Sequence, residues 1–99
     1  MLYYQKELDN LSNETIKAIE DYTEDNFSEK FFYKVGREFD DQRDDEDRIF
    51  FLENLAIDLE LDRFKLTDVQ AIIVAYMYVS DMFNRAYVYE VMKMLDNML

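Results

Sequence analysis

Seven carboxylates lie close together between positions 38 and 47, and they are the side chains that could most readily do chemistry in this sequence. They are Glu38, Asp40, Asp41, Asp44, Asp45, Glu46 and Asp47, with Arg43 as the one base among them. Carboxylates at this spacing could transfer protons, bind a cation such as Ca²⁺, or present negative charge to a partner. The rest of the sequence decides among these three uses.

Calcium binding and catalysis both lack the residues that they need. An EF-hand loop has Gly at its sixth position and Glu at its twelfth, but counting from Asp40 these positions hold Asp45 and Phe51. The chain has no His and no Cys, and one Gly. The usual general base, a thiolate nucleophile, a sulfur-bound zinc ion and a glycine-rich phosphate loop are therefore excluded. We expect no enzyme, no catalytic residue, no metal site and no cofactor.

The third use, an anionic surface, agrees with the distribution of charge. The formal net charge is −12, from 23 acidic and 11 basic residues in 99. Residues 38–47 contribute −6 of it, and residues 66–99 contribute only −2. The simplest interpretation is a solvated face that keeps the protein soluble. The functional interpretation is a surface that imitates a phosphate backbone and meets a basic protein, since direct binding to nucleic acid or an anionic membrane is disfavoured by charge.

The elements that position these carboxylates are predicted to be helices. Strand-like alternation is absent and the chain has no Pro, so we predict one all-α domain over residues 1–99, a compact bundle of four to six helices. The expected helices cover about 2–10, 13–22 after an N-cap at Ser12, a third one that starts from a capping box at Asn26 and Glu29, and 45–61. Residues 23–26 are interpreted as a polar connection between the second and third helices.

Two details of the third and fourth helices bear on packing. Gly36 lies inside the third helix, where the favoured explanation is close approach by a neighbouring helix. In the fourth helix, Phe50 and Phe51 are expected to widen the buried face formed by Ile49, Leu52, Leu55, Ala56 and Leu59. The carboxylates of residues 38–47 would then lie at the connection between these two helices.

The last third of the chain is unusually apolar, with 23 apolar residues among the 34 from Leu66 to Leu99. Thr67 and Gln70 form a capping-box pattern, which predicts a long apolar C-terminal helix, or a helix pair broken around residues 80–84, at the centre of the bundle. Residues two apart on a helix point about 200° apart, so one tyrosine of Tyr76/Tyr78 and of Tyr87/Tyr89 must meet a second surface. Tyr78 and Tyr89 are therefore candidate interface aromatics, or helices on two sides bury both members of each pair.

These observations lead to two functional hypotheses. The first is a non-enzymatic inhibitor that docks on the basic nucleic-acid-binding surface of a partner, in the manner of the DNA mimics that mobile elements use against restriction or CRISPR nucleases. The alternative is a homodimeric structural, assembly or toxin-immunity protein whose apolar C-terminal helix makes the interface. The longest apolar run, 71–79, is nine residues, about half of a ~20-residue membrane span. We therefore expect a soluble, cytoplasmic protein.

Overall fold

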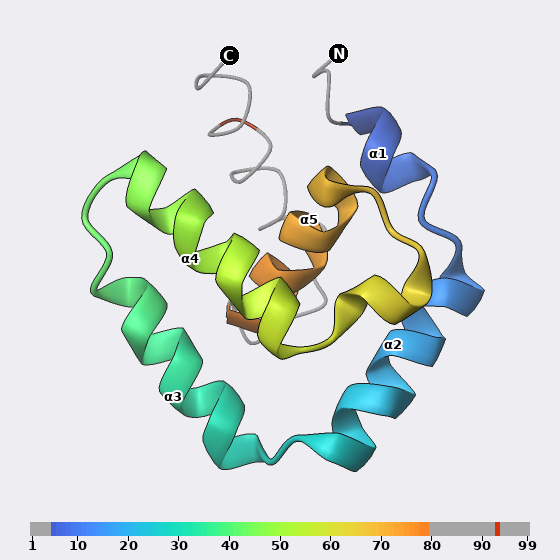
Figure 1. Cartoon of the computed structure of the whole chain (residues 1–99), viewed down its shortest axis with the longest axis horizontal. Helices are drawn as coiled ribbons and strands as arrows, with labels where there is room; N and C mark the ends of the chain where they lie inside the picture. The colour runs from blue at the N-terminus through green and yellow to red at the C-terminus, as the bar shows by residue number, and fades with distance from the viewer. Residues whose placement is uncertain (1–4, 80–92, 94–99) are drawn as a thin grey trace.

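Helices make up the regular structure of the computed structural model, which describes residues 5–79 and 93. Their bounds are α1 Gln5–Asp9, α2 Asn13–Asn26, α3 Glu29–Asp40, α4 Asp45–Asp58, the 3₁₀ turn η1 Leu61–Phe64 and α5 Asp68–Val79 (Figure 1). No strand occurs in this part of the chain. The predicted all-α class is confirmed, and the number of helices fits the expected four to six.

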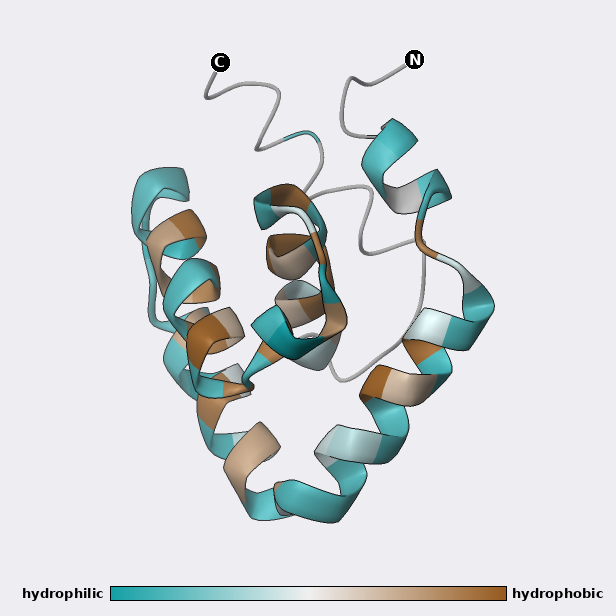
Figure 2. Ribbon diagram, turned by 45° about the vertical axis from the view of Figure 1, so that its right-hand side comes forward, coloured by the Kyte–Doolittle hydropathy of each residue, from teal (hydrophilic) through white to brown (hydrophobic). Residues whose placement is uncertain are grey.

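α5 occupies the centre, with α1 to α4 arranged around it in the plane of the view (Figure 1). Most of its residues are buried, on every side of the helix: Gln70, Ile72, Ile73, Val74, Ala75, Tyr76, Met77 and Val79. In Figure 2, hydrophilic residues predominate along α1 and α2, whereas hydrophobic ones recur along α3, α4 and α5. A central apolar helix is thus present, but its description ends at Val79. The predicted length of this helix, the break around residues 80–84 and Tyr89 lie outside the described residues.

Two of the predicted helix starts are confirmed by their hydrogen bonds. The hydroxyl of Ser12 accepts from the backbone N–H of Thr15 at 3.0 Å, as an N-cap does. At α5, Gln70 N–H donates to Thr67 Oγ1 at 3.1 Å, and Thr67 N–H donates to Gln70 Oε1 at 3.0 Å. Both ends of this capping box also reach α1, because Thr67 Oγ1 and Gln70 Nε2 donate to Glu7 at 2.6 and 3.1 Å. The box therefore fixes α1 against the start of the central helix.

The predicted connection at residues 23–26 is wrong, because α2 continues to Asn26. Thr23 is only 1% exposed, and its hydroxyl donates to the Ile19 carbonyl at 2.9 Å, which makes a polar residue acceptable inside the helix. The predicted cap at Asn26 is wrong too. Ser28 caps α3 by accepting from Phe31 N–H at 3.1 Å.

The fourth helix ends at Asp58, three residues before the predicted limit at 61. Glu60 has a left-handed backbone (φ 57°), and Lys65 does as well (φ 56°). A residue in this conformation cannot continue an α-helix, so the chain turns into η1 and buries Leu61.

The expectation for Gly36 is confirmed. A Cβ on this residue would lie 3.2 Å from the Val79 carbonyl oxygen, so the backbones of α3 and α5 approach closely at this point.

Candidate protein-binding surface

The seven carboxylates predicted from the sequence form one continuous part of the surface, which we call the acidic corner. Glu38 and Asp40 end α3, Asp41 and Asp44 lie in the connection, and the remaining three form the first turn of α4. All seven are exposed. The corner lies at the connection between the α3 and α4 ribbons, at the left edge of Figure 1. The structure thus leaves every candidate partner-binding carboxylate exposed along this helix end, connection and helix start.

Local hydrogen bonds give the corner its shape. The Asp44 carboxylate accepts from Asp47 N–H at 3.1 Å and thereby caps α4. At the end of α3, the Gln42 side-chain amide donates to the Glu38 carbonyl at 3.1 Å. Acidic residues in a first helical turn interact favourably with the helix dipole, which explains why Asp45, Glu46 and Asp47 are tolerated side by side at the start of α4.

Few cations offset this charge. Among the described residues, Lys34 lies 3.9 Å from Glu38 and Arg48 lies 3.5 Å from Asp45. Both pairs are substantially exposed to solvent, where an ion pair contributes little. Repulsion within the corner is visible at Asp47, because the neighbouring Asp44 carboxylate raises the pKa of Asp47 above its ordinary value. The corner is therefore a negative surface that nearby cations compensate only in part.

Metal ligation finds no support in the described residues. They contain no group of three or more Asp, Glu, His or Cys side chains that could hold a metal ion. The carboxylates of the corner spread along a helix end, a connection and a helix start, and this arrangement presents charge outward.

The candidate interface aromatic Tyr78 packs inside this chain. Its ring stacks on Phe32, with centroids 4.8 Å apart, and its hydroxyl lies 2.5 Å from Thr23 Oγ1. Burial raises the pKa of the Tyr78 hydroxyl to about 12. Tyr76, on the opposite side of α5, is 9% exposed and meets the ring of Phe39 edge-on. Both members of this pair are thus covered within the chain, Tyr78 by residues of α2 and α3 and Tyr76 by α3, whereas Tyr89 lies outside the described residues.

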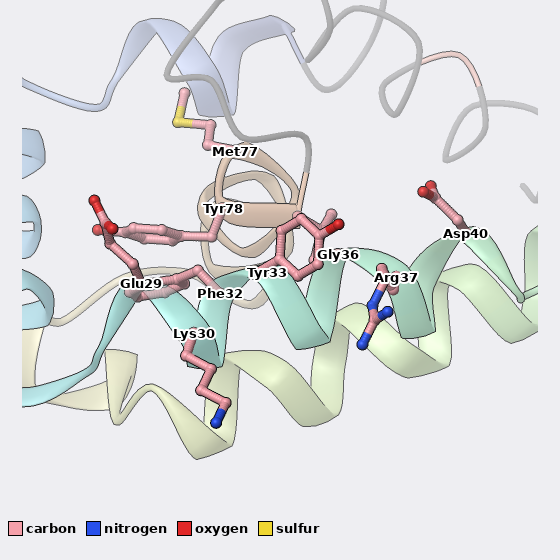
Figure 3. Close-up of a pocket in the computed structure, with 10 residues that line it drawn as sticks. Glu29, Lys30, Phe32, Tyr33, Gly36, Arg37, Asp40, Met77 and Tyr78 are labelled. Carbon is pink, nitrogen blue, oxygen red and sulfur yellow. The ribbon is translucent and has the colours of Figure 1, made fainter.

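A pocket of about 810 Å³ lies between α3 and the end of α5. Figure 3 shows Tyr33 and Arg37 on its α3 side, and the Arg37 guanidinium is 5.1 Å from the centre of the Tyr33 ring. Lys30 and Arg37 line the pocket together with Glu29 and Asp40. The pocket therefore adjoins the acidic corner at Asp40, but its own two acidic and two basic side chains balance in charge.

The outer face of α4 is a feature that the sequence reasoning missed. Phe50 and Ile57 are 66% and 72% exposed, so the expectation that Phe50 widens the buried face is wrong. Phe51 takes that place and packs against Phe39, with ring centroids 5.9 Å apart. A helical projection would have revealed the pair, since residues seven apart share a face and this face lies opposite Leu52 and Leu59.

Comparison with known proteins gives no further guide, because no protein family, curated protein or solved structure matches this chain. Within residues 5–79, no helix is long and apolar enough to cross a membrane.

Proposed function

We propose that this chain is a small acidic protein-binding module, a non-enzymatic inhibitor that docks on the basic nucleic-acid-binding surface of a cytoplasmic partner protein. The observation that supports this proposal is the acidic corner, where seven exposed carboxylates form one surface with little compensation by cations. A basic groove that binds nucleic acid also attracts such a surface, because the acidic corner, like the phosphate backbone, presents closely spaced negative charges to the groove.

The corner would act by occupying the site of the phosphates. Its field steers the basic partner during encounter, so association is fast at low salt and slows as ions screen the charges. Once docked, the carboxylates accept hydrogen bonds from the lysine and arginine side chains that otherwise contact the nucleic acid. Binding of this chain and of nucleic acid then exclude each other.

The alternative, a homodimer or toxin-immunity protein that associates through its apolar C-terminal helix, has less support in the described part of the chain. α5 buries its apolar residues against the helices around it, and Tyr78 belongs to that packing. The acidic corner, in contrast, is exposed as a whole.

The test compares two variants of equal net charge. The corner variant carries Asp40→Asn, Asp41→Asn, Asp44→Asn and Glu46→Gln; the control variant carries Glu14→Gln, Asp21→Asn, Glu24→Gln and Asp25→Asn on α2, where all four are exposed. Asparagine at position 44 still caps α4, so both variants are expected to fold, which circular dichroism checks.

Proteins captured from a native cytoplasm by the parent chain are then titrated with each variant at low and high salt, with nucleic acid as competitor. We expect the corner variant to lose binding and the control to keep it, and we expect nucleic acid to displace the parent chain. Equal binding by the two variants, or simultaneous binding of the chain and nucleic acid, contradicts the proposal.

A further inference from the structure

Two large apolar side chains are exposed on the outer face of α4. Phe50 and Ile57 retain 66% and 72% of their surface in contact with solvent. They are seven residues apart, which is two helical turns and about 10 Å along the axis, so they lie on one line along the helix. Apolar anchors at this spacing are typical of helices that pack on another helix.

Carboxylates flank this line on both sides. In helical projection Glu46 and Glu53 lie on one side, and Asp47 and Asp58 on the other, and all four are exposed. Arg48 is the one base in α4. It points toward the preceding connection, where its Nε donates to the Gln42 carbonyl at 3.3 Å and its guanidinium pairs with Asp45. The apolar line is therefore bordered by negative charge that Arg48 does not offset.

The border on the α3 side is hollowed into a groove of about 300 Å³. Phe50, Asp47 and Asp58 line it from α4, and Glu38 lines it from α3. Such a groove suits an arginine, because its aliphatic stem and planar guanidinium can cover an aromatic ring while its N–H groups reach carboxylates.

We infer that the outer face of α4 binds an amphipathic basic helix of a partner protein. The apolar stripe of that helix covers Phe50 and Ile57, and its arginines reach the carboxylates on either side. The inference rests on the proposed function and specifies the partner's chemistry. Charge complementarity selects this occupant: a second copy of the chain would set the carboxylates of one α4 against those of the other, whereas a basic helix neutralises them.

The test uses two synthetic, fluorescently labelled helical peptides of equal charge. One has leucines at positions i and i+7 with arginines on either side, and the other has serines in place of the leucines. Fluorescence anisotropy measures their affinity for the full chain at two salt concentrations. We expect the leucine peptide to bind about tenfold or more tightly than the serine peptide, and its advantage to persist at high salt, because apolar burial is not screened.

Substitution of the anchors locates the site. Because Phe50 and Ile57 are exposed, Phe50→Ser with Ile57→Ser should leave the fold intact, and we expect it to remove the advantage of the leucine peptide. Tyr33→Ser, which removes an equally exposed aromatic of α3 (69% exposed), is the matched control and should change nothing.

Three results overturn the inference: equal affinity of the two peptides, equal affinity of the parent chain and the Phe50/Ile57 variant for the leucine peptide, or a dimer in sedimentation that the Phe50/Ile57 variant dissociates. None of them touches the acidic-corner proposal, which fails separately if the corner and control variants bind the partner equally or if nucleic acid does not displace the parent chain.

Discussion

Asp44 belongs to the acidic corner and also caps α4, so its two roles must be separated before any binding assay is interpreted. Asp44→Ala removes the acceptor that receives Asp47 N–H at 3.1 Å, and loss of such a cap costs about 1 kcal/mol of stability. In a domain of this size, that loss corresponds to a decrease of roughly 4–8 °C in Tm. Asp44→Asn retains a side-chain oxygen that accepts the same bond, so it should keep the helix start.

The two variants, Asp44→Ala and Asp44→Asn, remove the same negative charge. Asp44 is the largest cause of the raised pKa of Asp47, and both substitutions remove it. A carboxyl whose pKa is raised by folding contributes stability that is present below its ordinary value of 3.8 and is lost as pH rises through the folded-state pKa. Both variants should therefore lose less stability than the parent chain as pH rises through this window. The difference between Ala and Asn at neutral pH then measures the cap alone.

Urea unfolding followed by circular dichroism gives the stabilities, and an NMR titration of the Asp47 carboxyl gives its pKa. We expect Asp44→Asn to match or exceed the parent chain at neutral pH, Asp44→Ala to lose about 1 kcal/mol, and the pKa of Asp47 to fall toward its ordinary value in both. Equal losses for Ala and Asn would refute the assignment of Asp44 as the cap. An unchanged Asp47 titration would refute the electrostatic part of the reasoning.

Three further predictions concern the contacts around α5. Thr67→Ala removes the N-cap of α5 and the hydrogen bond to Glu7. It should lower the stability of the fold by about 1 kcal/mol and speed amide hydrogen exchange in α1. Unaltered exchange in α1 would contradict the conclusion that the capping box fixes α1 against α5. Burial raises the pKa of Tyr78 from 10.0 to about 12. The stability that the buried Tyr78 hydroxyl contributes is therefore complete below pH 10 and declines as pH rises through 12. In Tyr78→Phe this decline should be smaller, which urea unfolding midpoints measured across that pH range will check. Gly36→Val places a branched side chain where an added Cβ alone would lie 3.2 Å from the Val79 carbonyl oxygen, so it should destabilise the fold by about 1–3 kcal/mol in urea unfolding. A value near zero would be incompatible with the close approach of α3 and α5.

Two helix starts could be predicted from sequence because a cap is a local signal, whereas the start predicted at Asn26 was wrong because Ser28 caps α3. Ser12 and the Thr67–Gln70 pair needed only their own neighbours to be recognised. The end of α2 was not predictable in this way. Thr23 is polar by type, yet it is buried because its hydroxyl has the Ile19 carbonyl one turn away and the Tyr78 hydroxyl on α5. The second of these contacts is 55 residues away in sequence, beyond the reach of any local pattern.

The outer face of α4 was missed for a related reason. Residues 49–52 are all apolar, so the run by itself does not mark which of Phe50 and Phe51 is buried, and the angular position of each relative to Leu52 and Leu59 has to be compared. Packing against α3 decides it, because Phe51 meets Phe39 there and Phe50 is left on the outside. The acidic corner, in contrast, followed from composition and spacing, since closely spaced carboxylates repel one another and remain exposed.

The acidic corner and the outer face of α4 share two residues, Glu46 and Asp47, and both surfaces are unfavourable for the isolated chain. At the corner, repulsion from the Asp44 carboxylate raises the pKa of Asp47. Along α4, Phe50 and Ile57 keep most of their surface in water. Departures from locally favourable choices are expected at functional sites. Charge that served only solubility would reduce neither the repulsion between the carboxylates nor the exposure of Phe50 and Ile57. One basic amphipathic helix lying along α4 would neutralise the carboxylates and cover the two apolar side chains in a single contact.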